Sequence, residues 1–500
     1  MSTLSELLPS GGGGSTVDFV ASGTLPNGKP VILKTNGQVE VVGESSNSVA
    51  ESIPSGSEAS FKPSNTADNF VAFDPNNAGK FVVTYTDSGN SSYGTAIVGE
   101  VSGNSISFGS EVVFNSASTA QGSMAFDPNT ANKFVVAYQN SSSTRGEAIV
   151  GTVSGNSITF GSVVVLDSSG GGLYSVAFDP NTAGKFAVAY TKAYANGEHG
   201  TAVVGTVSGT SISFGSFYTY NSAATYENKI SFDPNTANKF VVSYVDAGGS
   251  NYGRSCIGVI SGTSISFGSE YVFNGGSTDY VSCSFDPNTA NKFVVSYQDN
   301  SNSGYGTAVA GSVSGTSISF GSEVVFNSAS TAHSSMAFDP NTAGKFVVFY
   351  KDSTNSNYGE VRVGSLSGTT ISFGSVYLVN SGSTSYTSVS FDPNTAGKFV
   401  AVYRDTSDSR GQAILGQIAT TVTATNLTST NFVGTSTAAY TNGQTATIAI
   451  QGGLSTNQTG LTIGSTYYAQ GDGTISTVST SPAINIGKAL SATTLLLKDL

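Results

Sequence analysis

Few side chains in this sequence are suited to catalytic chemistry. The 500 residues include two histidines, His199 and His333, and two cysteines, Cys256 and Cys283. No His-x-x-x-His or Cys-x-x-Cys spacing occurs, so neither a zinc site nor a cysteine nucleophile is expected. The glycine strings lack the Lys-Ser/Thr pair of a phosphate-binding loop. The sequence therefore predicts no cofactor and no metal site.

Three polar loops carry acidic residues of the kind that bind calcium, at residues 87–90, 299–302 and 352–355. None of them contains the full Asp-x-Asp-x-Asp-Gly ladder of a calcium loop. The pattern favours polar turns, with calcium as the alternative.

The side chains best placed to bind a ligand are found by their distance from a repeated motif. Phe-Asp-Pro-Asn occurs seven times, at intervals of 52 to 54 residues. The residues five positions before each copy are Asp68, Gln121, Leu173, Glu227, Tyr280, His333 and Tyr386. Tyrosines among Asn, Ser and Gly offer flat faces suited to sugars. The candidate ligand-binding residues are Asp68, Gln121, Tyr174, Tyr226, Glu227, Tyr280, His333 and Tyr386; the alternative is that these tyrosines only cover loop backbone.

Asp68 and Glu227 are the acidic residues at this repeated position. A glycosidase needs two carboxyl groups within about 10 Å of each other. These two belong to the first and fourth repeats, so a seven-membered ring would place them on nearly opposite sides of its channel. We expect no enzymatic activity, and a glycosidase or lyase remains an alternative.

Each repeat predicts four short antiparallel strands. The second copy shows the order: a strand ending at Phe126, a second from Lys133 to Tyr138, a third around Ala148–Gly151, and a fourth from Ile158. Alternation of β-branched and aromatic residues marks the strands, and the Asp-Pro-Asn-Thr and Ser-Gly-Asn-Ser segments carry turn chemistry. The repeated Asp and Lys that flank the first turn are interpreted as scaffolding. The predicted fold class is all-β.

Repeats of this length form either a β-propeller or an open solenoid. The fourth-strand motif Ile-x-Phe-Gly-Ser occurs only six times, so the seventh repeat lacks its last strand. Residues 53–61 show the same register upstream of the first repeat. We therefore predict a seven-bladed β-propeller over residues 45–418, closed by pairing of residues 53–61 with the strand near Ala413–Gly416.

The connections within a repeat fall into two classes. Those between strands one and two and between strands three and four are nearly identical in every repeat, whereas the other two vary in length and composition. In an up-and-down blade the two classes lie on opposite faces, so ligand contact is expected on the variable face. Cys256 and Cys283 fall on apolar positions of strands that are not adjacent, which predicts buried free thiols rather than a disulfide.

The formal net charge of −12 disfavours nucleic acid and anionic membranes as partners. No apolar stretch is long enough to cross a membrane, and the first residues lack the basic and apolar regions of a secretion signal. Residues 1–16, with three leucines before four glycines, are interpreted as a docking peptide on a flexible tether or as a frayed terminus.

The two ends of the chain contain related hairpins. Leu25-Pro-Asn-Gly28 with Asn36-Gly37 matches Leu461-Thr-Ile-Gly464 with Asp472-Gly473 in spacing, and both Asx-Gly pairs predict type I′ turns. Because a closed ring would bring entry and exit together, residues 17–44 and 419–500 are expected to form one small accessory β module. Two independent linkers are the alternative.

Two terminal runs resemble modules of tailed-phage virion proteins, especially those of marine and cyanobacterial phages. They are Val17–Val31, reading VDFVASGTLPNGKPV, and Gly460–Thr474, reading GLTIGSTYYAQGDGT, which continues to GKALSAT at Gly487–Thr493. The resemblance implies a virion structural protein, assembled in the host cytoplasm and carried on the extracellular particle.

The expected function is an appendage or fibre component whose propeller face binds host-surface glycans. Residues 1–44 and 419–500 would bind other virion proteins, and the protein could form homo-oligomers in the particle. The alternative is a head or tail decoration or scaffold protein that binds only other virion subunits.

Overall fold

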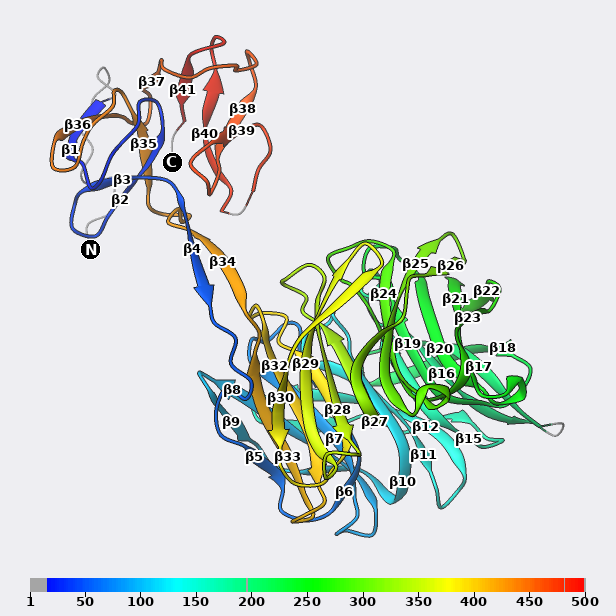
Figure 1. Ribbon diagram of the computed structural model, residues 1–500. Coiled ribbons are helices and arrows are strands. Elements are labelled where there is room, and N and C mark those ends of the chain that lie inside the picture. Colours follow the sequence, from blue (N-terminus) through cyan, green and yellow to red (C-terminus); the bar gives the residue numbers. More distant parts are fainter. Residues whose placement is uncertain (1–15, 195–196, 481, 499–500) are drawn as a thin grey trace. The chain divides into compact units, whose positions relative to one another are not determined.

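The computed structural model describes residues 16–194, 197–480 and 482–498, so the predicted docking peptide lies almost wholly outside the described residues. Within these ranges β-strands are the dominant secondary structure, and the only helical elements are the short 3-10 turns η1 (Ala247–Gly249) and η2 (Asn300–Asn302). The chain divides into two compact units. We call Ala50–Thr420 the repeat domain, and the segments up to Val49 and from Thr421 the terminal module (Figure 1).

Each Phe-Asp-Pro-Asn motif ends the first strand of an antiparallel unit, as the alternation of the sequence predicts. The first strand pairs with the second, the second with the third, and the third with the fourth. In the second unit these strands are β10 (Val112–Phe126), β11 (Lys133–Asn140), β12 (Arg145–Ser154), β13 (Ser157–Phe160) and β14 (Val164–Asp167), the last two of which share the fourth position.

The other units follow the same order. The first contains β6 (Thr66–Phe73), β7 (Lys80–Asp87), β8 (Tyr93–Ser102) and β9 (Ser105–Phe108); the third contains β15 (Gly171–Phe178), β16 (Lys185–Tyr194), β17 (Gly197–Ser208) and β18 (Ser211–Asn221). The fourth contains β19 (Thr225–Phe232), β20 (Lys239–Asp246), β21 (Tyr252–Ser261) and β22 (Ser264–Phe267); the fifth contains β23 (Tyr271–Phe285), β24 (Lys292–Asp299), β25 (Tyr305–Ser314) and β26 (Ser317–Phe320). The sixth contains β27 (Val324–Phe338), β28 (Lys345–Asp352), β29 (Tyr358–Ser367) and β30 (Thr370–Asn380).

The seventh unit takes its strands from both ends of the repeat domain. Its sheet has the order β31-β32-β33-β5, with β31 (Thr384–Phe391), β32 (Lys398–Asp405), β33 (Arg410–Gln417) and β5 (Ala59–Lys62). Ala59 lies opposite Ala413, and the Ser55 backbone N–H donates to the Leu415 carbonyl oxygen at 2.6 Å. The Tyr403 hydroxyl donates to the carboxylate of Glu58, which follows Gly-Ser as Glu111 does in the first unit.

Three strands are longer than the sequence predicts, because they serve two units each. β10, β23 and β27 begin by pairing with the third strand of one unit and end as the first strand of the next. In β10 the register shifts twice between Val113 and Ser118, so the chain changes partner through bulges instead of a closed turn.

A glycine and two phenylalanines form the core of each unit. In the first unit Phe81 is fully buried, and its ring centroid lies 5.3 Å from that of Phe73. A Cβ atom on Gly99 of the third strand would lie 2.1 Å from the Phe81 ring, so only glycine fits beneath this phenylalanine. Val83 and Tyr85 continue the same buried cluster. It includes Val400 and other apolar residues of the seventh unit, so the last unit packs against the first.

Both cysteines are free thiols, as the sequence predicts, but only Cys256 is fully buried and Cys283 is half-buried. The prediction that their strands are not adjacent is wrong: Cys256 lies on β21 and Cys283 on β23, which pair with each other through an earlier part of β23. The two cysteines belong to different hydrophobic clusters. Burial raises the pKa of Cys283 to about 11 and also raises that of Cys256, so both sulfurs are protonated near neutral pH.

The terminal module contains two five-stranded sheets and a two-stranded ribbon. The first sheet has the order β1-β36-β35-β2-β3 and combines strands from both ends of the chain; the second has the order β37-β41-β40-β38-β39. The strands are β1 (Thr16–Val20), β2 (Pro30–Leu33), β3 (Val39–Val41), β35 (Phe432–Ser436), β36 (Thr445–Ala449), β37 (Leu454–Ser455), β38 (Thr466–Ala469), β39 (Ile475–Ser476), β40 (Ile484–Ala489) and β41 (Leu495–Leu497), with β4 (Glu44–Val49) pairing β34 (Thr420–Thr425).

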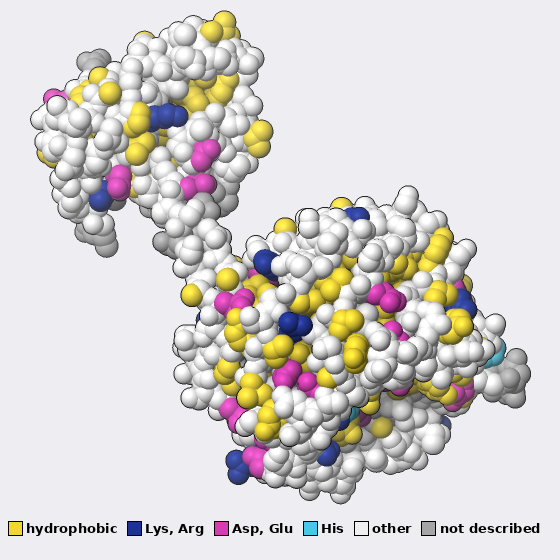
Figure 2. All heavy atoms as spheres, viewed as in Figure 1, with side chains coloured by type: hydrophobic (Ala, Val, Ile, Leu, Met, Phe, Trp, Pro, Cys, Tyr) yellow, Lys and Arg dark blue, Asp and Glu magenta, His cyan; other side chains and the backbone are white. Residues whose placement is uncertain are grey.

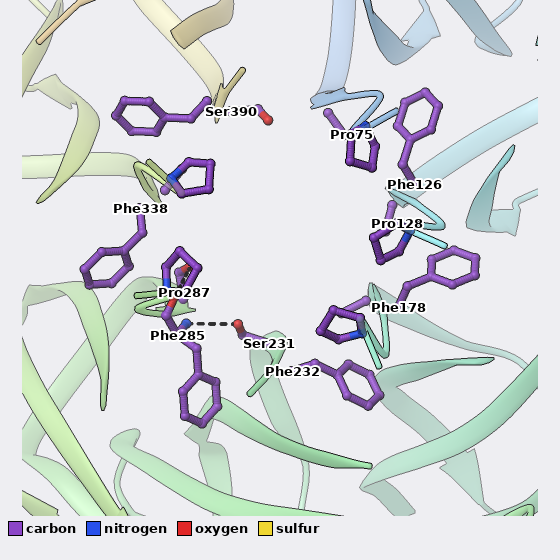
Figure 3. Close-up of a pocket in the computed structure, with 18 of the residues that line it drawn as sticks. Pro75, Phe126, Pro128, Phe178, Ser231, Phe232, Phe285, Pro287, Phe338 and Ser390 are labelled. Carbon is purple, nitrogen blue, oxygen red and sulfur yellow. Dashed lines mark hydrogen bonds between the residues drawn. The ribbon is translucent and has the colours of Figure 1, made fainter. Parts of the chain in front are cut away.

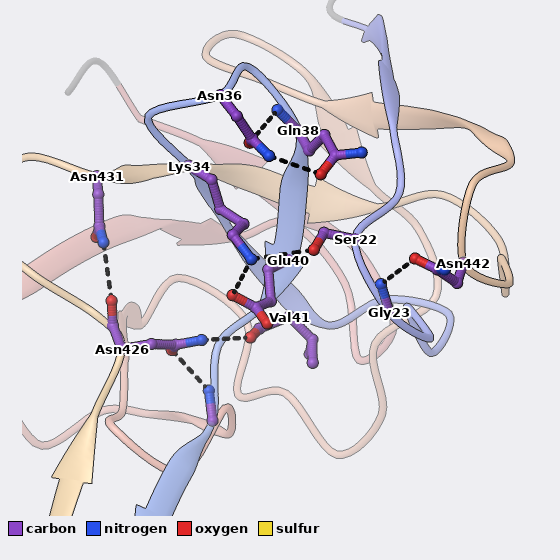
Figure 4. Close-up of polar contacts among 11 residues, drawn as sticks. Ser22, Gly23, Lys34, Asn36, Gln38, Glu40, Val41, Asn426, Asn431 and Asn442 are labelled. Atoms are coloured by element: carbon purple, nitrogen blue, oxygen red, sulfur yellow. Dashed lines mark hydrogen bonds and ion pairs between the residues drawn. The ribbon is translucent and has the colours of Figure 1, made fainter.

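Side chains also join the two ends of the chain. Asn442 Oδ1 accepts from the Gly23 backbone N–H at 2.9 Å, and Asn426 Nδ2 donates to the Val41 carbonyl oxygen at 2.9 Å (Figure 4). Residues from both ends of the chain therefore contribute strands to one sheet.

The prediction of type I′ turns is wrong for both hairpins. A type I′ turn needs positive φ at both central residues. Here Gly37 has a φ of +80° and Gly473 a φ of +79°, whereas Asn36 and Asp472 stay at negative φ. Each glycine N–H bonds back to the carbonyl three residues earlier, which describes a type I turn followed by a left-handed glycine. The Asx oxygen instead accepts the N–H two residues on, from Gln38 and from Thr474.

Candidate functional site

The first strand of every unit contains a bulge at the position singled out in the sequence. In the fourth unit, for example, the register of β19 against β20 shifts between Tyr226 and Lys229. The residue inside each bulge adopts a left-handed backbone conformation, which is uncommon for any residue but glycine. These residues are Asp68, Gln121, Leu173, Glu227, Tyr280, His333 and Tyr386, with φ values from +48° to +59°.

The seven bulges line a single cavity of about 230 Å³. It is formed by the bulge residues and by residues that follow them, such as Asn69, Asn228 and Lys229. It lies at the start of the first strands, where the variable connections enter. The structure thus brings Asp68, Gln121, Glu227, Tyr280, His333 and Tyr386 of the sequence prediction together.

The two other predicted ligand-binding tyrosines lie differently. Tyr174 is among the residues that line the cavity, but it is 3% exposed and its ring stacks on Tyr190 with centroids 5.3 Å apart, so most of this side chain belongs to the core. Tyr226 is 44% exposed and lies outside the cavity lining. Both flank a bulge residue, and the cavity lining contains the bulge residues and several residues that follow them, but not Tyr226. Counting back from the motif did not reveal how the bulge redirects the strand.

Hydrogen bonds link neighbouring bulges on one side of the cavity. Asp68 Oδ2 accepts from the Gln121 backbone N–H at 2.8 Å, and Gln121 Oε1 accepts from the Leu173 N–H at 2.8 Å. These bonds satisfy bulge N–H groups that no longer pair within their own sheets and fix the direction of both side chains.

The other side of the cavity is aromatic. The centroid of the His333 ring lies 5.1 Å from that of Tyr280 and 5.5 Å from that of Tyr386. The guanidinium carbon of Arg404 lies 5.5 Å from the Tyr386 centroid, within the range of a cation–π contact. Burial, reinforced by Lys351 and Arg404, lowers the pKa of His333 to about 4. The imidazole is therefore neutral near neutral pH and adds to a continuous row of rings.

The cavity also contains two half-buried carboxyl groups, those of Asp68 and Glu227. Burial raises the pKa of Asp68, an effect opposed by the hydrogen bond from Gln121 and by the charge of Lys229. Burial likewise raises the pKa of Glu227. The charge of Lys229 lowers this pKa, and the charge of Asp279 raises it further. The Lys229 ammonium therefore acts electrostatically on both carboxyl groups.

Lys229 and Asn69 were missed from the sequence. Lys229 stands where five other units have serine, at Ser123, Ser175, Ser282, Ser335 and Ser388. This single charged residue at a repeated position was the sequence signal that could have identified it.

Asn69 is 2% exposed, and neither polar atom of its amide has a partner. Its counterpart Asn228 donates to Thr191 Oγ1 at 2.9 Å and accepts from Tyr220. Asn69 thus offers unused hydrogen-bonding capacity at the cavity wall.

A second cavity, of about 450 Å³, lies at the opposite ends of the first strands. The phenylalanines and prolines of the Phe-Asp-Pro-Asn motifs surround it (Figure 3). Around its rim the motif asparagines donate to the next unit: Asn76 Nδ2 to the Pro128 oxygen at 3.3 Å and Asn394 Nδ2 to the Pro75 oxygen at 3.3 Å. The carboxylate oxygens of the motif aspartates accept hydrogen bonds from backbone N–H groups of the turns. These aspartates therefore stabilise the turns, as the sequence predicts.

The acidic loops considered for calcium use their carboxylates to cap turns. Asp299 Oδ1 accepts from the N–H groups of Ser301 and Asn302, and Asp352 Oδ1 accepts from that of Thr354. Within the described residues, no group of three or more acidic, histidine or cysteine side chains is arranged to hold a metal ion. The same part of the chain contains no helix that could span a membrane.

No family model matches the chain, and no curated protein matches it significantly. Among solved structures, Chaetomium thermophilum Sqt1, bound to the N-terminus of the ribosomal protein L10, has a TM-score of 0.45 at 11% identity, over 72% of this chain and 86% of that one. AofleA from Arthrobotrys oligospora gives 0.43 at 9% identity, over 71% and 95%. The NanB sialidase of Streptococcus pneumoniae gives 0.41 at 11% identity, over 74% and 71%. Scores this low support no inference about ligand or activity.

Proposed function

We propose that this protein is a non-enzymatic binding protein whose repeat domain is a seven-bladed β-propeller, and that the cavity at the bulges binds a sugar residue of a surface glycan. The N-terminal strand β5 completes the last blade in this arrangement. The observation that carries the proposal is the single cavity to which all seven units contribute one bulge residue.

Closure of the propeller is supported by contacts that repeat around the domain. The Val176 N–H donates to Ser123 Oγ in the preceding unit, and the Val71 N–H of the first unit donates to Ser388 Oγ of the seventh. The asparagine-to-proline bonds follow the same pattern. An open array would leave the first and last units without these partners.

The composition of the cavity suits a sugar. Aromatic rings can pack against the C–H face of a pyranose, while carboxylates and amides bond its hydroxyl groups. Tyr280, His333 and Tyr386 supply the rings, and Asp68, Gln121 and Asn69 supply polar groups. The volume lies below the roughly 300–1,000 Å³ of drug-sized pockets, so we propose recognition of one terminal or branching residue of a glycan.

A glycan array with the purified protein tests this proposal. We expect selective binding that Tyr386→Ala weakens by about tenfold or more, because loss of a stacking ring costs roughly 1–2 kcal/mol. Tyr226→Ala is the matched control, since this tyrosine is exposed outside the cavity. The proposal fails if no glycan binds, or if Tyr226→Ala and Tyr386→Ala weaken binding equally.

A glycosidase or lyase is the second candidate, favoured by one observation. Asp68 and Glu227 line the same cavity, and burial raises the pKa of both, as is common for catalytic acids. Depolymerisation of a glycan found on the array, abolished by both Asp68→Asn and Glu227→Gln, would establish an enzyme. Binding without product would support the non-enzymatic reading.

We further propose that the terminal module attaches the protein to a phage particle. The support is the resemblance of Val17–Val31 and Gly460–Thr474 to tailed-phage modules. If the protein instead binds virion subunits tightly and no host glycan, a decoration or scaffold role replaces adhesion.

A further inference from the structure

The contact between the seventh unit and the first leaves several buried polar atoms without a hydrogen-bond partner among the described residues. They are both amide atoms of Asn69, the hydroxyl oxygen of Thr66 and Nε of Arg404. We call these three residues the junction cluster. Arg404 Nη1 donates to the Thr66 carbonyl oxygen at 3.3 Å, and Asn69 lines the candidate ligand cavity. Because buried polar groups are nearly always paired in folded proteins, these atoms need an explanation.

The fourth unit shows how the equivalent asparagine is satisfied inside the protein. Asn228 occupies the position of Asn69 and contacts the third unit as Asn69 contacts the seventh. Its Nδ2 donates to Thr191 Oγ1 at 2.9 Å, and its Oδ1 accepts from the Tyr220 hydroxyl at 2.7 Å. Both polar atoms of this amide are therefore used by the fold.

The corresponding partners are missing next to Asn69 because the seventh unit has different residues. Arg404 stands at the position of Thr191, and Phe61 stands at the position of Tyr220. A guanidinium group cannot accept a hydrogen bond, and phenylalanine has no hydroxyl to donate one. The Asn69 amide therefore keeps both a donor and an acceptor for another molecule.

The Thr66 hydroxyl has lost its partner in a similar way. In four other units the equivalent threonine accepts from an asparagine four residues before it, as Thr119 does from Asn115 at 2.8 Å. The residue four positions before Thr66 is Lys62, whose Nζ instead pairs with Asp87 at 2.7 Å. Sequence differences at one junction have thus freed polar groups that the equivalent residues elsewhere use.

Arg404 also brings a positive charge that the contact between units does not need. In other units the residue at its position makes the same bond to the next unit with a neutral group, as Thr86 and Gln139 do. Among the described residues, no carboxylate forms an ion pair with Arg404. The guanidinium is half-buried, and its carbon lies 5.5 Å from the ring centroid of Tyr386, which lines the cavity.

The neighbouring unit adds a second unpaired cation. Lys351 occupies in the sixth unit the position that Arg404 occupies in the seventh, and it too forms no ion pair within the part of the chain that the structure describes. The charges of both residues act on His333 and lower its pKa. Figure 2 shows few lysine and arginine side chains on the visible face of the repeat domain, and they lie apart. Two unpaired cations beside one cavity are therefore a distinctive feature of a chain with a net charge of −12.

The carboxyl groups of the cavity do not cancel this positive charge. Asp68 Oδ2 accepts from the Gln121 backbone N–H, on the side of the second unit. Glu227 belongs to the fourth unit, and the Lys229 ammonium acts electrostatically on both carboxyl groups. Positive charge therefore remains on the aromatic side of the cavity.

We propose that the sugar bound in the cavity carries an anionic group, a carboxylate or a sulfate, and that the junction cluster binds this group. Arg404 Nε, the Asn69 amide and the Thr66 hydroxyl would donate hydrogen bonds to its oxygens, and Arg404 and Lys351 would balance its charge. Because the three donors are buried, the anion reaches them by a rotation of the Tyr386 side chain. This inference rests on the proposed function, since it names the class of sugar for the same cavity.

Equilibrium binding to three polysaccharides of matched length tests this inference: one neutral, one with carboxylates and one with sulfates. We expect the full chain to bind at least one anionic polysaccharide about tenfold or more tightly than the neutral one, and the one that it prefers identifies the group. Arg404→Gln should remove this preference, because it removes a charge-assisted hydrogen bond. Gln139 makes the equivalent bond to the next unit, so Arg404→Gln preserves the contact between units.

Arg410→Gln is the matched control. Arg410 is an exposed arginine of the same unit that pairs with Asp408 at 3.4 Å, so its loss changes the net charge equally without affecting the cavity. Asn69→Leu keeps the volume of the side chain and should weaken binding of the anionic polysaccharide several-fold. It should not lower the melting temperature, because the fold does not use this amide.

The outcomes separate this inference from the proposed function. If the neutral polysaccharide binds as tightly as both anionic ones and Tyr386→Ala still weakens binding, the sugar site is supported and the preference for an anion is wrong. If the preference persists in Arg404→Gln but disappears in Arg410→Gln, the anion does not bind at the junction cluster. If no polysaccharide binds, both the proposed function and this inference fail.

Discussion

At the scale of single residues, the left-handed bulge is the feature that makes the candidate site. It brings the bulge residue of each first strand, together with some of the residues that follow it, to the same cavity. Tyr226 and Glu227 are adjacent in sequence, yet one lies outside the cavity and the other lines it. The identity of the bulge residue, rather than the local richness in tyrosine, therefore determines the character of the cavity.

His333 predicts a pH dependence of stability. Its pKa is about 4 in the folded protein and near 6.5 when unfolded, so the unfolded chain binds the proton more tightly. Stability should fall as the pH drops from about 6.5 toward about 4, by at most roughly 3 kcal/mol from this residue. Urea unfolding at both ends of this range should show a smaller pH effect in His333→Gln than in the wild type. His199→Gln is the control, and an unchanged pH effect in His333→Gln would contradict the assignment.

At the scale of elements, local sequence signals determine the strand order within each repeat. They do not determine the pairing of β5 with β33, which joins the two ends of the repeat domain. The Phe–Gly and Phe–Phe contacts within a unit fix four strands once the turns are in place. β5 has no local turn to bring it to β33, since more than three hundred residues separate them. Its place depends on the packing of Phe61 over Gly411 and against Tyr85.

Phe61 should therefore contribute as much stability as its counterparts inside the domain. It is 3% exposed with its ring 5.3 Å from Tyr85, and Phe326 is fully buried with its ring 5.1 Å from Tyr350. We expect Phe61→Ala and Phe326→Ala each to reduce the free energy of unfolding by about 3–5 kcal/mol, as measured by urea titration. A loss below about 1 kcal/mol for Phe61→Ala alone would show that β5 is peripheral.

At the scale of the whole molecule, the repeat domain is inserted in the sequence of the terminal module. The chain leaves the first sheet after β3 and returns to it at β35, and the repeat domain lies between them in sequence. An insertion of this kind is tolerated when the inserted part folds by itself.

A chain restricted to residues 50–420 should accordingly fold, because it keeps β5 and every strand of the repeat domain. A chain of residues 63–420 should aggregate, because β33 would become an uncovered edge. Circular dichroism and size-exclusion chromatography compare the two. Equal solubility and equal melting temperatures would contradict a structural role for residues 53–62.

The sequence by itself determined the all-β class, the antiparallel order within each unit and the relation between the terminal hairpins, because these depend on turns and alternation that are local in the chain. Only the tertiary structure decided which side chains share a cavity, and that Lys229, Asn69 and Arg404 belong to its surroundings. Those outcomes depend on bulges, on strand register and on packing between distant segments, and no short stretch of sequence encodes them.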